Sequence, residues 1–136
     1  MPKRRLLLDT GPLVALFDQK DKLHPAAKRF FSTVDAKFFT TWPVITEVCH
    51  FIPYRNHSGL LRAVSSGLFT VVGFDDGVER ITDLSVKYSD QEADFADLSL
   101  IFAAEKVGIV EIVTVDVTDF SVYRISGRKR FTVVPI

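Results

Sequence analysis

The chain has 136 residues, the length of one ordinary domain, and we expect a single domain over 1–136. Its composition, 47% hydrophobic and 25% charged, is typical of a folded globular protein and excludes a disordered chain. Lys and Arg total 17, as do Asp and Glu, which excludes a strongly basic nucleic-acid binder. A nucleic-acid partner would need a local basic patch or bridging metal ions.

Signals for cellular compartment and membrane are few. The single cysteine, Cys49, excludes an internal disulfide and a cysteine-based zinc site, and it fits a reducing cytoplasm. Asp9 interrupts the apolar run near the N-terminus, and no apolar run approaches the length of a membrane span. We therefore expect a cytoplasmic protein with neither signal peptide nor transmembrane helix.

Short apolar runs alternate with helical spacings along the chain. In chain order they predict a strand at 5–8, helices at 13–17 and 22–31, a strand at 37–41, helices at 43–52 and 58–66, a strand at 69–72, helices at 76–88 and 94–106, and strands at 111–115 and 131–134. This alternation favours parallel pairing and predicts an α/β fold, a three-layer α/β/α sandwich around a mostly parallel sheet of about five strands. Ligands bind such sheets at the carboxyl ends of the strands.

Acidic residues fall where that edge of the sheet would lie. Asp9 ends the first strand, and Asp116 follows the strand at 111–115. Asp94 and Asp97, three residues apart, project from the same side of the first turn of their helix. Glu47 lies about one turn into the helix after the second strand. We expect these carboxylates to converge.

Each acid also has a purely structural interpretation, as a turn residue, a helix cap, a first-turn acid or an exposed helix charge. These interpretations apply to Asp9, Glu47, Asp94, Asp97, Asp116 and Asp119. They are independent of one another, and none predicts that the acids share one edge of the sheet.

Clustered carboxylates repel one another and raise their own pKa values, and a divalent cation offsets that repulsion far better than a helix N-terminus does. All-oxygen ligands select Mg²⁺ or Mn²⁺, so the pattern predicts metal-dependent phosphodiester hydrolysis without a covalent enzyme intermediate. The hydroxyls of Thr10, Thr46 and Thr114 neighbour three of the acids, and we expect them to orient these acids through hydrogen bonds. For Thr46 and Thr114, an ordinary β-branched residue at a strand end is the alternative.

Four motifs, in this order and at these distances, carry a family resemblance. They are LLDTGPLVAL at 7–16, TEV at 46–48, DFADLSL at 94–100 and TVDVTDF at 114–120, the last followed by Tyr123 and Arg124. Over nearly its whole length the chain resembles the PIN-domain ribonucleases, in particular the VapC-like toxins of toxin–antitoxin pairs. One departure is that Val117 and Thr118 stand where we expect arginines in close relatives, which removes two phosphate contacts.

The resemblance implies a metal-dependent endoribonuclease of the PIN-like fold. Position by position, it implies that Mg²⁺ or Mn²⁺ is held by Asp9, Glu47, Asp97 and Asp116, with Asp94 and Asp119 as accessory acids. It also implies an RNA substrate, a homodimer and an antitoxin that blocks the site.

Two further features have open interpretations. A basic cluster follows the last motif, either as a phosphate-contacting rim beside the metal site or as a solvated hairpin-like turn around Gly127; it comprises Arg124, Arg128, Lys129 and Arg130. The 12 phenylalanines are mostly expected in the core, and some of them could form an apolar patch for a dimer or an antitoxin.

Two other classes of function remain. One is a catalytically silent PIN-like binding module, which the presence of every expected acid disfavours. The other is a different phosphate-handling α/β protein, such as a receiver domain or a haloacid-dehalogenase-like phosphatase. The first would need paired acids after the first strand and the second an Asp-x-Asp motif there, whereas Gly11 occupies the second position after Asp9.

Overall fold

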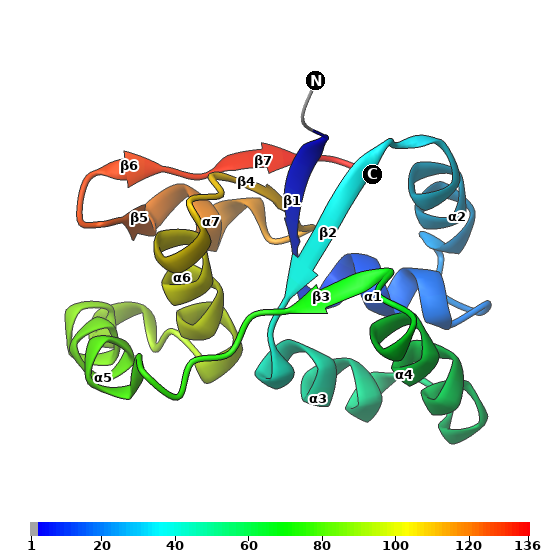
Figure 1. The fold of residues 1–136 in the computed structure, drawn as a ribbon, viewed down its shortest axis with the longest axis horizontal. Helices are drawn as coiled ribbons and strands as arrows, with labels where there is room; N and C mark the ends of the chain where they lie inside the picture. Colours follow the sequence, from blue (N-terminus) through cyan, green and yellow to red (C-terminus); the bar gives the residue numbers. More distant parts are fainter. Residues whose placement is uncertain (1–2) are drawn as a thin grey trace.

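A computed structural model describes residues 3–136, so the first two residues of the predicted domain lie outside the described residues. A parallel sheet of five strands forms its centre, in the order β3-β2-β1-β4-β7 (Figure 1). The strands are β1 (Arg4–Leu8), β2 (Ala36–Thr40), β3 (Phe69–Val71), β4 (Glu111–Val113) and β7 (Thr132–Val134). This confirms the predicted mostly parallel sheet of about five strands.

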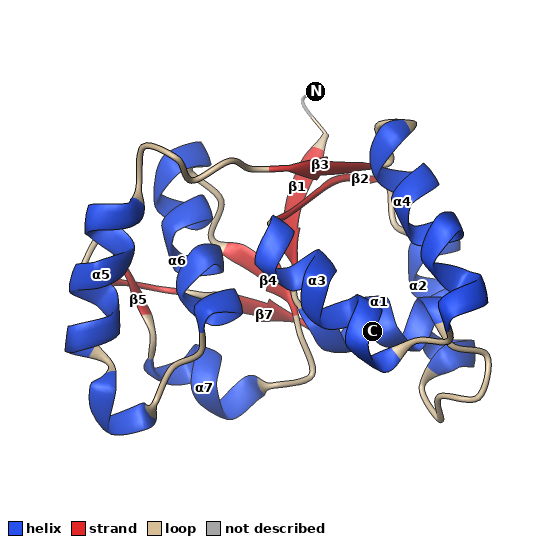
Figure 2. Ribbon diagram, turned by 90° about the horizontal axis from the view of Figure 1, so that it is seen from below, coloured by secondary structure: helices blue, strands red, loops and turns tan. Residues whose placement is uncertain are grey.

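Helices flank the sheet. They are α1 (Thr10–Phe17), α2 (His24–Thr33), α3 (Trp42–Phe51), α4 (His57–Ser65), α5 (Val78–Lys87), α6 (Phe95–Val107) and α7 (Val117–Val122). In Figure 2, α5, α6 and α7 lie on one side of the sheet, and α1, α2 and α4 lie on the other. Two 3₁₀ turns (Tyr54–Asn56 and Ser89–Gln91) and a small antiparallel hairpin of β5 (Arg124–Ile125) and β6 (Lys129–Arg130) complete the fold.

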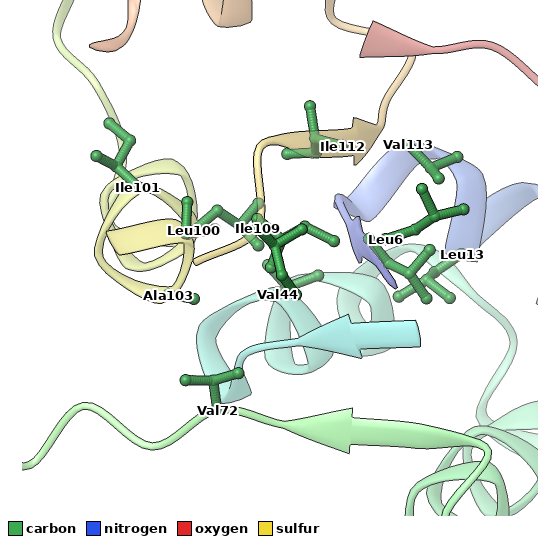
Figure 3. Packing of buried hydrophobic residues seen from close by; sticks show 14 of the residues in the cluster. Leu6, Leu13, Val44, Val72, Leu100, Ile101, Ala103, Ile109, Ile112 and Val113 are labelled. Carbon is green, nitrogen blue, oxygen red and sulfur yellow. The ribbon is translucent and has the colours of Figure 1, made fainter. Parts of the chain in front are cut away.

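Apolar side chains on both faces of the central strands build the core. Leu6, Leu7 and Leu8 of β1 are all fully buried, as expected for a parallel strand covered by helices on both sides. Leu100 of α6 and Ile112 of β4 belong to the same cluster (Figure 3). The core therefore fixes α6 against the middle of the sheet, next to the strand ends that carry acidic residues.

Parallel pairing brings the ends of β1 and β4 together. Leu8 pairs with Val113, and the backbone N–H of Asp9 donates to the Val113 carbonyl at 3.0 Å. The Thr40 hydroxyl at the end of β2 donates to the Leu8 carbonyl at 2.9 Å. The chain segments that leave these three strands thus start from one edge of the sheet.

Several predicted boundaries differ from the structure. The helix predicted at 13–17 already begins at Thr10, and the one predicted at 76–88 begins at Val78, because Asp76 pairs instead with Lys106 at 3.0 Å. The strand predicted at 111–115 ends at Val113, where the chain turns toward α7. The helix α7 and the strands of the hairpin were not among the predicted elements. No helix among residues 3–136 combines the length and hydropathy that a membrane crossing requires.

Candidate metal centre

Asp9 follows β1 and stands at the N-cap position of α1, yet its side chain makes no capping hydrogen bond. Its Oδ2 instead accepts a hydrogen bond from the Thr114 hydroxyl at 2.7 Å. Only 6% of Asp9 is exposed. The carboxylate is therefore directed mainly to the end of β4, while the backbone N–H of Thr10 at the start of α1 also lowers its pKa.

Thr114 connects the acids of the two neighbouring strands. Its Oγ1 donates to Asp9 and accepts from the backbone N–H of Asp116 at 2.9 Å. Asp116 in turn caps α7, because its Oδ1 accepts from the backbone N–H of Asp119 at 3.1 Å. We expected Thr114 to orient its sequence neighbour Asp116, but its hydroxyl contacts only the backbone N–H of that residue and donates instead to the carboxylate of Asp9.

The first turn of α6 supplies the next two acids. Asp94 is the N-cap residue and accepts from the backbone N–H of Asp97 at 2.8 Å, so its capping interpretation is confirmed. Asp97 is buried, and its Oδ2 accepts from the Tyr123 hydroxyl at 2.7 Å. Tyr123 comes directly after α7, so this hydrogen bond ties the segment after α7 to the start of α6.

These acids form a cluster at the carboxyl edge of the sheet. One carboxylate oxygen from each of Asp97, Asp116 and Asp119 lies within 4.8 Å of the other two. Asp9 and Glu47 lie close enough to interact with this cluster, since both Glu47 and Asp116 raise the pKa of Asp9. Of the acids predicted to converge, the structure brings Asp97 and Asp116 together, and Asp119 lies with them.

Burial in this cluster disfavours charge. Burial is the main reason that the pKa of Asp97 rises to about 8. The hydrogen bond from Tyr123 lowers this pKa, and the nearby carboxylates of Asp9, Asp94 and Asp116 raise it further. Burial likewise raises the pKa of Asp9 to about 6, although the Thr114 hydrogen bond lowers it. Burial and the Asp97 carboxylate also raise the pKa of Tyr123, which keeps its hydroxyl protonated as a donor.

The residues present fit a hard divalent cation. The three converging side chains offer only carboxylate oxygens, the donors that Mg²⁺ and Mn²⁺ prefer. The hydroxyl of Thr10, next to Asp9, is buried and has no hydrogen-bond partner among residues 3–136. A cation among these carboxylates would offset both their burial and their mutual repulsion.

Thr46 does not take the orienting position that we expected. Its hydroxyl donates to the Trp42 carbonyl one turn earlier in α3, at 3.0 Å. Such a bond is a common alternative for a threonine inside a helix, where the carbonyl four residues earlier lies within reach. The neighbouring Glu47 is half-buried on the same helix.

Three members of the basic cluster, Arg128, Lys129 and Arg130, lie at the tip and on the second strand of the hairpin, whereas Arg124 directly follows Tyr123. Arg124 donates from Nη1 to the carbonyls of Ser121, Val122 and Tyr123, which caps the C-terminus of α7. At the hairpin tip, the backbone N–H of Ser126 donates to Glu105 at 2.7 Å. Glu105 lies eight residues after Asp97 on α6, or about 12 Å along the helix axis. The tip is therefore displaced from the acid cluster, and it has the form of the predicted turn around Gly127.

The contact of Tyr123 with the acid cluster is the feature that the sequence does not reveal. The sequence places Tyr123 shortly after the last motif and gives it no partner. A buried tyrosine hydroxyl needs a hydrogen-bond partner, which is the one general signal that pointed to such a contact. Only the fold shows that this partner is Asp97.

Comparisons with known proteins agree with this geometry. No family model matches the chain. Ribonuclease VapC26 of Mycobacterium tuberculosis is 27% identical over 136 residues, which cover 96% of this chain and 100% of that protein. The crystal structure of VapC20 from Mycobacterium tuberculosis, a toxin that cleaves the sarcin–ricin loop, matches the fold with a TM-score of 0.70. That match has 20% sequence identity and covers 79% of this chain and 86% of VapC20.

The full-length likeness, the matching fold and the acid cluster agree with one another: the chain is similar to a VapC ribonuclease over 96% of its length, and its fold is that of a VapC toxin.

Proposed function

We propose that this chain is an endoribonuclease whose catalytic centre consists of Asp9, Glu47, Asp97 and Asp116. The observation that carries the proposal is the convergence of Asp97, Asp116 and Asp119 within 4.8 Å at the carboxyl edge of the sheet. Mg²⁺ or Mn²⁺ would be held there by the catalytic acids, with Asp94 and Asp119 as accessory acids. When bound, the cation would lower the pKa of a coordinated water and stabilise the negative charge that develops during the reaction.

The protein's own contribution to the reaction is the positioning of carboxylates. Hydrolysis adds the elements of water across one P–O bond of RNA, so the acids must stay ionised and fixed around the scissile phosphate. The hydroxyls of Thr114 and Tyr123 fix one carboxylate each, on Asp9 and Asp97. Thr10, buried beside Asp9, is the remaining orienting hydroxyl in this proposal. Such outer contacts hold ligands in the geometry that the metal requires.

The partners proposed for the chain are an RNA substrate, a cognate antitoxin and a second copy of the same chain, acting in the cytoplasm. Exposed apolar residues at the end of α3, just after it and on α4 support the proposal that a protein partner covers this surface. Phe51 is 64% exposed, Tyr54 86% and Leu61 46%. On the hairpin, Arg128, Lys129 and Arg130 are exposed and are proposed to contact RNA phosphates away from the scissile bond, whereas Arg124 stabilises α7.

The test is cleavage of a panel of structured and single-stranded RNAs by purified protein with added Mg²⁺ or Mn²⁺. Chelation should stop cleavage, and Asp97→Asn and Asp116→Asn should each lower the rate by about 100-fold or more, because each removes a charged ligand. Asp35→Asn is the matched control, since Asp35 precedes β2 at the opposite edge of the sheet and pairs with Lys3.

Two results would contradict the proposal. Full cleavage by both Asp97→Asn and Asp116→Asn proteins would show that the acids are wrongly assigned. Failure of the native protein to cut any RNA with either metal, together with unimpaired growth on expression, would favour the catalytically silent module instead.

A further inference from the structure

An apolar groove of about 530 Å³ lies beside the acid cluster and shares Glu47 and Asp94 with it. Its other lining residues are Trp42, Pro43, Thr46 and His50 of α3 and Phe74, Phe95 and Ala96. Neither Lys nor Arg is among the lining residues in the part of the chain that the structure describes. A ligand in this groove would therefore be held by aromatic and apolar contact rather than by positive charge.

Two aromatic side chains of the groove stay open to solvent. Trp42 is 48% exposed and Phe95 is 51% exposed. The Phe95 ring is supported from one side by an edge-to-face contact with Phe74, with ring centroids 5.4 Å apart. Large aromatic surface next to a catalytic centre is thus presented rather than buried, which is typical of a binding surface.

The two rings belong to the first residues of two different helices, and a hydrogen bond connects the starts of these helices. Trp42 is the first residue of α3 and Phe95 is the first of α6. Just beneath them, the buried hydroxyls of Thr41 and Ser99 form a hydrogen bond of 2.6 Å. The groove is therefore built before any ligand arrives, which lowers the entropic cost of binding.

We infer that this groove binds an unpaired nucleobase of the RNA substrate, stacked on Trp42 and Phe95 and adjacent to the phosphate at the acid cluster. The inference rests on the proposed ribonuclease function. Because Glu47 and Asp94 border both sites, a phosphate at the acids would bring a base from the same stretch of strand to the groove. A neutral base can approach these carboxylates where a second phosphate could not.

The scarcity of basic residues near the site makes such stacking more important. Val117 and Thr118, which directly follow Asp116, are uncharged, and the hairpin tip lies away from the acids. Aromatic stacking is a principal source of affinity for single-stranded nucleic acids, and it tolerates any base because every base has a flat face. Unpaired bases are also the parts of RNA that proteins can reach most easily.

The test uses Trp42 as its own reporter, because the sequence contains a single tryptophan. The full-length Asp97→Asn protein in Mg²⁺ is titrated with a mixed-sequence single-stranded RNA of about eight nucleotides, within the usual range for single-strand sites. A second strand of equal length carries abasic riboses at every position. The RNA with bases should quench the tryptophan fluorescence on binding, and the abasic strand should not, although it carries the same phosphates.

Variants then test the stacking contacts by fluorescence anisotropy of end-labelled strands. Phe95→Ala should weaken binding of the RNA with bases by about 5- to 150-fold, the equivalent of one lost stack, and leave the abasic strand unaffected. Trp42→Phe, which retains a ring, should keep most of the affinity that Trp42→Ala loses. Val86→Ala removes a more exposed apolar side chain on α5, outside the groove, and should change neither strand's binding.

Equal quenching by both strands, or equal loss of affinity for both in the Phe95→Ala protein, would overturn the inference and leave the groove to another occupant, such as a peptide side chain. Cleavage of RNA by the native protein would still stand in that case. Absence of binding by either strand together with absence of cleavage would instead refute the proposed function, and this inference with it.

Discussion

At the scale of single residues, Tyr123 is the clearest test of how the protein fixes the acids proposed to be catalytic. Tyr123→Phe removes the hydroxyl that donates to Asp97 and keeps the ring that packs against Tyr88 and Phe120, each with centroids 5.1 Å away. We expect RNA cleavage to fall about 10- to 100-fold, as for other groups that orient metal ligands. Because the lost hydrogen bond lowers the pKa of Asp97, the pH–rate profile should also move to higher pH.

Tyr88→Phe is the matched control for this change. The Tyr88 hydroxyl accepts from the backbone N–H of Arg124 at 2.8 Å. Its loss leaves that N–H without its partner and should lower the free energy of unfolding by about 1–3 kcal/mol, with no change in the pH profile of cleavage. Equal activity profiles for Tyr123→Phe and the native protein would show that Asp97 needs no support from Tyr123.

At the scale of secondary-structure elements, Gly11 sets how closely α1 approaches the segment after β4. A Cβ at Gly11 would lie 2.5 Å from Cγ2 of Val115, the residue before Asp116. The side chain of Val115 is β-branched and rotates little, so the added methyl group must displace the backbone of one segment. We expect Gly11→Ala to cost about 1–3 kcal/mol of stability and to lower cleavage by moving Asp116.

The double variant with Val115→Ala separates this clash from other effects of the alanine. Val115 is 50% exposed, so shortening it removes the clash and little core packing. Both the unfolding midpoint in denaturant and the cleavage rate should return to near native values. If the double variant is no better than Gly11→Ala alone, the close approach is not the reason for glycine at this position.

The hairpin is a second element with a distinct expectation. Because its tip is fixed on Glu105, about 12 Å along α6 from Asp97, its exposed charges can contact RNA only away from the scissile bond. Replacing Arg128 and Lys129 by serine should reduce the slope of log affinity against log salt by about one for each lost contact. The cleavage rate at saturating RNA should stay unchanged. An unaltered slope would show that the hairpin is an ordinary solvated turn.

Local patterns were enough to predict the elements that pack into the centre of this fold. Apolar runs such as Leu6 to Leu8 and the helical spacing of α6 are strong signals, and parallel order then brings their acidic ends together. The helix α7 was missed because six residues give too little periodicity, and its stability comes from tertiary packing of Phe120 and Tyr123. The two-residue strands of the hairpin fall below any pattern for the same reason.

Contacts between segments distant in sequence could not be predicted. Thr46 and Thr114 both lie close to an acidic residue in the sequence. Only the hydroxyl of Thr114 contacts a carboxylate, that of Asp9, whereas the hydroxyl of Thr46 donates to a backbone carbonyl. The difference is that Thr46 lies inside a helix, where a backbone carbonyl is always within reach, whereas Thr114 follows a strand and meets the neighbouring strand's acid. Likewise, the groove lined by Trp42 and Phe95 depends on the packing of α3 against α6, to which the hydrogen bond between Thr41 and Ser99 contributes.

At the scale of the whole molecule, the acid cluster should set how stability depends on pH. Asp9 and Asp97 have raised pKa values, about 6 and about 8, whereas in the unfolded chain an aspartate titrates near the usual value of about 3.9. Between these limits the folded protein binds more protons than the unfolded chain does. Stability therefore falls as the pH rises through this window, and it is greatest at the acid end, where both carboxyls are protonated.

We accordingly expect the metal-free protein, kept in chelator, to have a higher melting temperature at pH 5 than at pH 8. Asp97→Asn should flatten this dependence, since the amide cannot ionise. Added Mg²⁺ or Mn²⁺ should raise the melting temperature of the native protein more at pH 8 than at pH 5, because cation and protons compete for the same oxygens. A metal-free protein that becomes steadily more stable toward pH 8 would mean that the carboxylates do not repel one another in the folded state, and the case for a cation among them would lose its physical basis.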